Sequence, residues 1–177
     1  MDAPRIRQAR PEDAPALPRI ERSAGAAFKT VPALSWIAGD SVMSEAAHRQ
    51  WIAAGTSWVA EDDEGPVGFL AAETVDDALH IWEIAVRLDK QGRGVGSRLI
   101  ETAAEHAEAA GLHMLTLTTF REVPWNEPFY HRIGFATLAE DEIDARLADI
   151  LRREAIAGLP AERRCAMRRM LHAHVEI

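Results

Sequence analysis

The feature that most constrains this chain is the stretch EIAVRLDKQGRGVGSRLI, where an apolar run meets three glycines just before a helical pattern. Gly92, Gly94 and Gly96 alternate over five positions. Because a glycine inside a helix costs about 1 kcal/mol against alanine, the cluster indicates that something approaches the backbone closely. A strand-to-helix junction also leaves unpaired N–H groups at the positive end of the helix dipole, which attracts anions. The stretch therefore predicts a phosphate-binding elbow, with Arg93 and Arg98 beside it, in preference to a flexible surface turn.

The composition is that of one soluble globular domain over residues 1–177, with 47% apolar and 27% charged residues. The net charge of −8 argues against a nucleic-acid backbone as the partner. No apolar run approaches the roughly 18 residues of a membrane-spanning helix, and the N-terminal residues have no signal-peptide core. The single cysteine, Cys165, excludes an internal disulfide and a cysteine-based metal cluster. We expect a cytoplasmic protein that uses no metal and binds no membrane, and a homodimer stays open.

Hydrophobic periodicity and turn residues predict a mixed α+β chain without repeats or linkers. Strands are expected at 6–9, in the two halves of SWVAEDDEGPVGFLAAETV, and at 79–86, 114–119, 135–138 and 165–171. Helices are expected after Pro11, from Ser44 to about Ala54, after the elbow, within PWNEPFYHRIGF and at 143–157. The helix after the elbow carries one apolar stripe, formed by Leu99, Ile100, Ala103, Ala107 and Ala110. The segment 29–44 is expected to be irregular.

Two other phosphate-binding motifs fit the elbow poorly. A dinucleotide fingerprint has the spacing G-x-G-x-x-G after a first strand, but here Ser97 stands where the last glycine should fall. The strands before the elbow read as a hairpin meander and not as βαβ units. A Walker loop is missing as well, because no Gly-Lys-Ser/Thr sequence follows. A nicotinamide-dependent oxidoreductase is therefore disfavoured.

The elbow and a second motif resemble the GNAT acyl-CoA N-acetyltransferases. The residues QGRGVG match the family's Q/R-x-x-G-x-G/A signature after the expected strand end IAV, and NEPFYHRIGF matches a second landmark further along. The resemblance covers the order of elements from about Ile6 to Leu138. It implies a mixed, mostly antiparallel central sheet of about six to seven strands flanked by helices. In the family two central strands, here 79–86 and 114–119, splay apart and leave a slot for the cofactor.

The resemblance also implies acetyl-CoA as the co-substrate and assigns residues to it. The pantetheine arm is expected to pair with the backbone of Ile84, Ala85 and Val86 and to contact Asn126, with Phe129 packing nearby. The pyrophosphate is expected on the amides of Gln91, Gly92, Arg93, Gly94, Val95, Gly96 and Ser97. The glycine elbow predicts this pyrophosphate contact independently of the resemblance.

Transfer of an acetyl group to an amine needs a proton acceptor for the amine and a proton donor for the departing thiolate. Tyr130 falls on the family's thiol-protonating position, although an aromatic residue there could also be core. Glu83 lies inside an otherwise apolar strand. It is either a general base whose pKa burial raises or a structural carboxylate paired with an arginine. His80 is a second candidate base, but a half-exposed strand histidine is the simpler expectation.

The acceptor amine is expected to be a small molecule, held by an apolar lining. In the family the first two helices and their connection shape the acceptor pocket, which here brings in Phe28 and Trp36. Trp125 is expected to close the slot beside the thioester, whereas Trp51 is expected to pack in the core. The alternative to an enzyme is a GNAT module that binds or senses acyl-CoA without transferring the acyl group.

Overall fold

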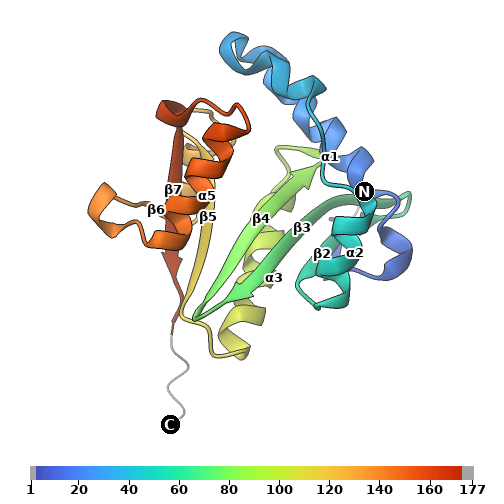
Figure 1. Cartoon of the computed structure of the whole chain (residues 1–177). Helices are drawn as coiled ribbons and strands as arrows, with labels where there is room; N and C mark the ends of the chain where they lie inside the picture. The colour runs from blue at the N-terminus through green and yellow to red at the C-terminus, as the bar shows by residue number, and fades with distance from the viewer. Residues whose placement is uncertain (1–2, 173–177) are drawn as a thin grey trace. The chain divides into compact units, whose positions relative to one another are not determined.

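The computed structural model describes residues 3–172, which form a seven-stranded sheet with helices on its faces (Figure 1). The strands are β1 (Arg5–Gln8), β2 (Ser57–Asp62), β3 (Gly65–Val75), β4 (Ala78–Val86), β5 (Met114–Phe120), β6 (Ala136–Thr137) and β7 (Arg164–Met170). The α-helices are α1 (Leu17–Gly25), α2 (Glu45–Ala53), α3 (Val95–Ala109), α4 (Glu127–Arg132) and α5 (Ala145–Ile156). The strand order is β1-β2-β3-β4-β5-β7-β6.

The sheet is mixed and mostly antiparallel. β1 with β2, β2 with β3, β5 with β7, and β6 with β7 pair antiparallel. β4 and β5 pair in parallel over three residue pairs, from Ala78–Met114 to His80–Thr116. The predicted α+β class and the mixed sheet flanked by helices are therefore confirmed.

The chain divides into two compact units. The first comprises the residues up to Thr74 together with Ile81–His106, and the second comprises Val75–His80 and the residues from Ala107 onward. β3, β4 and α3 each contribute residues to both units. That residues 1–177 form one domain remains a prediction.

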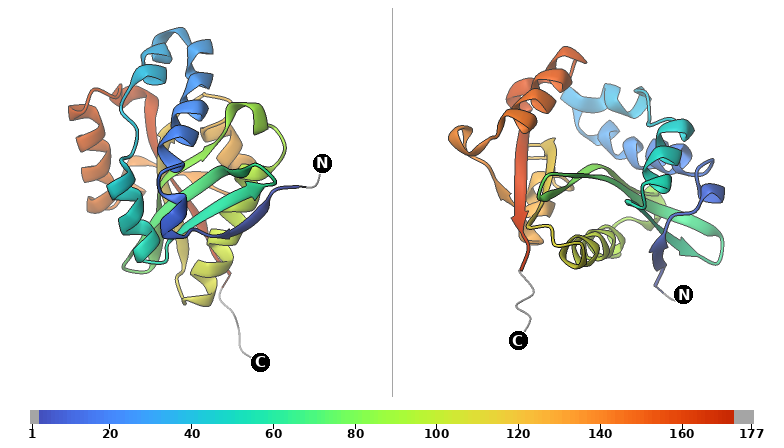
Figure 2. Two further views of the ribbon diagram at one scale, coloured as in Figure 1. Left: turned by 90° about the vertical axis from the view of Figure 1, so that its right-hand side faces the viewer. Right: turned by 60° about the horizontal axis from the view of Figure 1, so that its bottom comes forward.

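In the first unit, helices cover both faces of the strands (Figure 2). On one face Leu17 and Ile20 of α1 pack with Val59 and Phe69 of the strands. On the other face α3 packs against β2 and β3, and a Cβ built on Gly68 would lie 3.5 Å from Leu99 of α3. The same Cβ would lie 3.1 Å from the carbonyl oxygen of residue 85, so β3 and β4 need a glycine at this position.

In the second unit, α5 packs on one face of β5 and β7. Its core contains Leu147 and Ile150 of α5 together with Ala166 of β7 and Leu138. The helix begins after Asp144, whose side-chain Oδ1 accepts a 2.7 Å hydrogen bond from the backbone N–H of residue 147. This cap fixes the first turn of α5, which carries Arg146.

Two details of the predicted elements are wrong. The segment 29–44 contains a 3-10 helix, Pro32–Gly39, that follows another, Ala26–Thr30. Pro32 fixes the backbone for a helical start, and Leu34 is fully buried, which anchors the segment. Ala110 is exposed and does not belong to the buried stripe, because α3 ends at Ala109 and the chain turns away at Gly111. No helix within residues 3–172 combines the length and the apolar character that a membrane span requires.

Candidate active site

The glycine elbow leads into α3 in the first unit and has the backbone shape that its sequence predicts. Gly92 and Gly94 have φ angles of +72° and +75°, in the left-handed region that side chains rarely adopt. A Cβ at either position would meet no protein atom within 4 Å, so the space beside the backbone is open. The backbone N–H of Arg98 donates to the carbonyl oxygen of residue 94 at 3.1 Å. The N–H groups of the preceding residues lie before this bond and have no partner within the helix. The elbow can therefore cradle an anion.

Charges around the elbow are mostly paired within the protein. Lys90 Nζ lies 2.6 Å from a carboxylate oxygen of Asp62, and Arg87 forms a two-bond pair with the carboxylate of Asp89. Arg98, expected to face the phosphate, donates instead to the carbonyl oxygen of residue 4 at 2.6 Å. Arg93 is exposed, and within residues 3–172 it has no carboxylate partner. This cation of the elbow therefore stays available to an anionic ligand.

The end of β4 is tied to the elbow. The side-chain amide of Gln91 donates to the backbone carbonyl of Val86 at 2.9 Å, so this carbonyl is already engaged within the protein. Ile84 and Val86 are partly buried, whereas Ala85 is only 4% exposed. The geometry keeps the elbow close to the strand whose backbone is expected to bind the pantetheine arm.

Glu83 is partly buried on β4. Its alternation partners Ile81 and Ala85 are each 4% exposed, while Trp82 on the opposite face is 39% exposed. Trp82 Nε1 donates to a carboxylate oxygen of Glu73 at 2.9 Å. This bond links the exposed side chain of Trp82 on β4 to β3. At this part of β4, Glu83 therefore shares a face with buried residues, and its role as a base or as a structural carboxylate remains a prediction.

The second landmark forms α4 in the second unit. Asn126 occupies its N-cap, with φ −114° and ψ −116°, and its side-chain Oδ1 is buried with no hydrogen-bond partner within the described residues. An orphaned buried acceptor is costly unless a ligand satisfies it. The amide N–H groups of a pantetheine arm are donors of the required kind, so this residue fits acetyl-CoA.

Tyr130 is 6% exposed and lies on α4 within an aromatic cluster. Its ring makes edge contacts with Phe129 and Phe135, at centroid distances of 5.2 and 5.5 Å. These contacts fix the ring and therefore the direction of its hydroxyl. They also show that the residue contributes to the core, so packing and proton donation are compatible roles.

Glu127 positions α4, and sequence reasoning missed it. Its carboxylate accepts hydrogen bonds from Thr137 Oγ1 at 2.6 Å and from the backbone N–H of Glu122 at 3.3 Å. Burial alone would raise the pKa of Glu127, but these hydrogen bonds and the charge of Arg121 lower it. The carboxylate therefore stays ionised and joins the loop before α4 to β6. No local sequence pattern predicts the bond between Glu127 and Thr137, which lie ten positions apart.

His80 corrects an expectation, because it is a buried residue and not a half-exposed one. It is 1% exposed, and its Nδ1 lies 2.9 Å from Thr116 Oγ1. Burial and the positive charge of Arg146 lower the pKa of His80 to about 3, against a smaller opposite effect of Asp144. An imidazole this weakly basic cannot take a proton from an alkylammonium, so His80 is a poor general base.

The residues expected to line the acceptor pocket lie on different elements. Phe28 is partly buried and Trp36 is 44% exposed, both in the 3-10 segments of the first unit. Trp125 is partly buried and precedes α4 in the second unit. Trp51 packs against the core of the first unit, as expected. Their contact with an acceptor remains a prediction.

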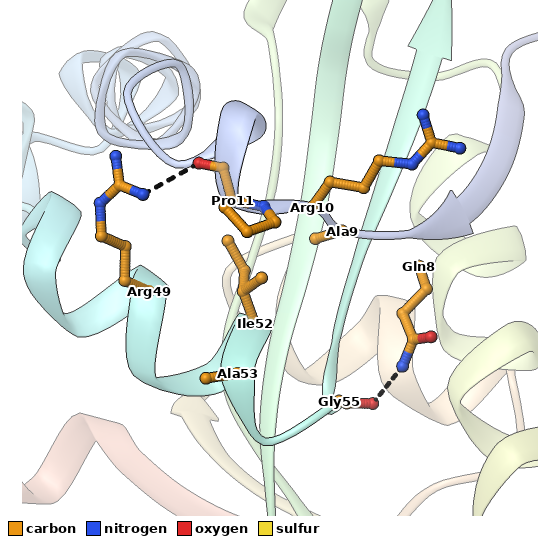
Figure 3. Close-up of a pocket in the computed structure, with 8 residues that line it drawn as sticks. All are labelled: Gln8, Ala9, Arg10, Pro11, Arg49, Ile52, Ala53 and Gly55. Carbon is orange, nitrogen blue, oxygen red and sulfur yellow. Dashed lines mark hydrogen bonds between the residues drawn. The ribbon is translucent and has the colours of Figure 1, made fainter.

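A pocket of about 400 Å³ lies elsewhere in the first unit, between β1 and α2 (Figure 3). Two of its polar side chains are engaged within the protein. Arg49 Nη1 donates to the carbonyl oxygen of Pro11 at 3.1 Å, and Gln8 Nε2 donates to that of Gly55 at 2.7 Å. Arg49 also pairs with Glu45 on its own helix. The pocket contains no predicted site residue, so it is not the site that the motifs indicate.

Comparison with known proteins agrees with these motifs. The model of the Acetyltransferase (GNAT) family matches residues 28–135, which is more than half of the chain. The chain therefore belongs to the GNAT acetyltransferase family. Within residues 3–172 no group of three or more histidine, cysteine, aspartate or glutamate side chains is arranged to hold a metal ion.

Three solved structures share the fold. The PaiA N-acetyltransferase of Thermoplasma acidophilum, solved with coenzyme A, is 16% identical with a TM-score of 0.69, covering 96% of this chain and 99% of that one. The ribosomal-protein-S18-alanine N-acetyltransferase of Escherichia coli is 18% identical with a TM-score of 0.66, covering 98% and 97%. N-acetylglutamate synthase of Neisseria gonorrhoeae, solved with coenzyme A and N-acetyl-glutamate, is 22% identical with a TM-score of 0.69. The match covers 97% of this chain and 36% of the synthase.

Proposed function

We propose that this protein transfers the acetyl group of acetyl-CoA to a primary amine by direct attack within a ternary complex. The observation that carries the proposal is the elbow before α3, where Gly92 and Gly94 leave open space beside a helix N-terminus. The family match and the orphaned Oδ1 of Asn126 support it. A single domain over residues 1–177 and a cytoplasmic location belong to the same proposal.

The cofactor-binding residues act through backbone groups more than through charge. The amides of residues 91–97 donate to the pyrophosphate, and Arg93 adds a cation that has no carboxylate partner among the described residues. The backbone of Ile84 and its two successors pairs with the pantetheine arm, and Asn126 accepts from one of its N–H groups. Phe129 packs beside the arm. Bound acetyl-CoA supplies an activated thioester.

The chemistry then needs two proton transfers. Glu83 takes the proton of the attacking amine, directly or through water, while the N–C bond forms. As the C–S bond breaks, Tyr130 donates its phenolic proton to the thiolate sulfur, so the free thiol leaves. Cys165 takes no part, because it is buried and burial raises the pKa of its thiol to about 11.

We propose a small-molecule amine as the acceptor, with Phe28, Trp36 and Trp125 as its apolar lining. The aromatic character of these three side chains supports this, since small-molecule pockets are lined predominantly by hydrophobic and aromatic residues. The fold itself is shared by N-acetylglutamate synthase and by an enzyme named for a ribosomal protein. It therefore does not choose the acceptor.

The test is release of coenzyme A thiol from acetyl-CoA with a panel of primary amines, with the acetylated product identified by mass. Tyr130→Phe keeps the ring contacts and removes the hydroxyl, so kcat should fall by about 10²- to 10⁴-fold with acetyl-CoA affinity unchanged. Thr102→Val is the matched control, because it also removes a hydroxyl, one that donates to the carbonyl oxygen of Arg98 within α3, and it should retain kcat. If the protein binds acetyl-CoA tightly but releases no coenzyme A thiol with any amine of the panel, acetyl transfer is overturned and a binding module is indicated.

A further inference from the structure

Helix α5 makes two polar contacts with β5 in the second unit, and the two contacts differ in whether the charged side chain has a partner of opposite charge. Thr116 and Thr118 are two residues apart on β5, so their side chains share the face that α5 covers. Thr118 Oγ1 donates to Glu154 of α5 at 2.5 Å. Both carboxylate oxygens of Glu154 also accept from Arg164, at 2.9 and 3.0 Å. At this contact the chain supplies a counter-charge for a partly buried carboxylate.

At the other contact the counter-charge is missing. Arg146 Nη2 donates to Thr116 Oγ1 at 3.2 Å, while Nη1 is buried and has no hydrogen-bond partner within the described residues. No carboxylate among residues 3–172 lies within salt-bridge distance of this guanidinium. Arg146 as a whole is partly exposed, but a buried N–H without a partner is unfavourable unless an anion or another acceptor satisfies it.

The groups around Arg146 do not neutralise it. His80 is the other partner of Thr116, and burial together with the charge of Arg146 keeps its imidazole neutral. Asp144, the acidic group that acts on the same imidazole, is exposed, and its Oδ1 accepts from the first turn of α5. Arg146 itself is partly exposed and its stem is flexible, so a small rotation that keeps the bond from Nη2 to Thr116 can present Nη1 to an incoming group.

We propose that Arg146, supported by Thr116, binds a carboxylate of the acceptor, so that the preferred acceptors are amines that also carry a free carboxylate. This inference rests on the proposed acetyl transfer and names the substrate class for it. A carboxylate fits because its two oxygens match the planar fork of a guanidinium, and one arginine supplies one compensating charge. A phosphate dianion would call for more cations than this cluster contains. His80 lies in the same cluster as a neutral group beside the bound anion.

The test compares each amino acid with its C-terminal amide, using glycine and glycinamide, and alanine and alaninamide, as acceptors in the thiol-release assay. The ratio of kcat/KM for the acid to kcat/KM for the amide should be at least tenfold higher in wild-type protein than in Arg146→Gln, with the change mainly in KM. Comparing variant with wild type cancels the different basicity of the two amines. Arg152→Gln is the matched control, because Arg152 is on the same helix, 62% exposed and paired with Asp149. Its acid-to-amide ratio should equal that of wild type.

A second arm needs no turnover and no variant. N-acetylglycine and N-acetylglycinamide are titrated into the wild-type protein with coenzyme A present, and thermal protection is measured. The acid should protect at a concentration at least tenfold lower than the amide. Equal protection, or an unchanged acid-to-amide ratio in folded Arg146→Gln, would overturn the carboxylate site and leave Arg146 a structural residue. Failure of acetyl transfer itself shows differently, as absent thiol release with every amine in wild-type protein.

Discussion

Replacing one glycine of the elbow separates cofactor binding from stability. Gly94 has φ +75° and Gly111, at the other end of α3, has φ +74°. A Cβ at either position would meet no protein atom within 4 Å. The two alanine variants therefore carry the same backbone strain, about 1 kcal/mol, and no added clash. For a chain of this length, each should lower the melting midpoint by roughly 2 to 4 °C.

Affinity for coenzyme A should distinguish the two variants. In Gly94→Ala the new methyl group occupies the open space beside the amides that are proposed to hold the pyrophosphate. Loss of one hydrogen bond to a charged acceptor costs about 1.5–3 kcal/mol, which weakens binding by roughly 10- to 150-fold. Gly111→Ala should bind as wild type does. Isothermal calorimetry with coenzyme A measures both, and equal affinities in the two variants would refute the role assigned to the elbow.

Three further outcomes follow from the described residues. Burial lowers the pKa of His48 to about 4, so the unfolded chain takes up this proton near pH 6.5 and the folded protein only near pH 4. His48 should thus contribute roughly 3 kcal/mol to the fall in the free energy of unfolding as the pH drops through that window. Burial also lowers the pKa of His80, to about 3, so His80 adds a fall of its own. In urea titrations His48→Leu should therefore reduce the total fall by roughly 3 kcal/mol, whereas His113→Gln, at an exposed histidine, should leave it unchanged. Glu83→Gln should lower kcat by at least about 100-fold near neutral pH, with partial recovery at alkaline pH where the amine is already neutral; an unchanged rate would make Glu83 a structural carboxylate. Cys165→Ala should retain kcat in the same assay, and a dead but folded variant would contradict direct transfer.

The local devices of this fold were predictable from residue type and spacing. The hairpin of β2 and β3, the Ser44 cap of α2 and the elbow before α3 all depend on residues that are neighbours along the chain. Ser44 Oγ accepts from the backbone N–H of residue 47 at 3.2 Å, as a capping residue should. Short-range geometry of this kind needs no knowledge of distant contacts, so the amino-acid sequence is sufficient to derive it.

Longer-range contacts could not be derived in that way. From its own strand His80 is expected to be half-exposed, but its ring is buried and lies against Thr116, 36 positions away. Arg146 lies within the helix expected at 143–157, but no local pattern indicates that its side chain contacts Thr116, 30 positions away. The 3-10 helix around Leu34 is anchored by the burial of that side chain, which no local periodicity in the sequence predicts. The motifs of the site were predictable because each is a run of neighbouring residues. The charge balance of the site was not, because it depends on pairs of residues that are distant in the sequence.

The most direct test of the central claim is a thermal-shift titration with acetyl-CoA, with NAD and ATP as controls. Ligand at about 100 times its dissociation constant adds roughly 2.7 kcal/mol to the free energy of unfolding. For a chain of this length the midpoint should rise by roughly 5 to 10 °C with acetyl-CoA and stay unchanged with the controls. No shift with acetyl-CoA, or a shift with NAD in its place, would contradict the assignment of the elbow to coenzyme A.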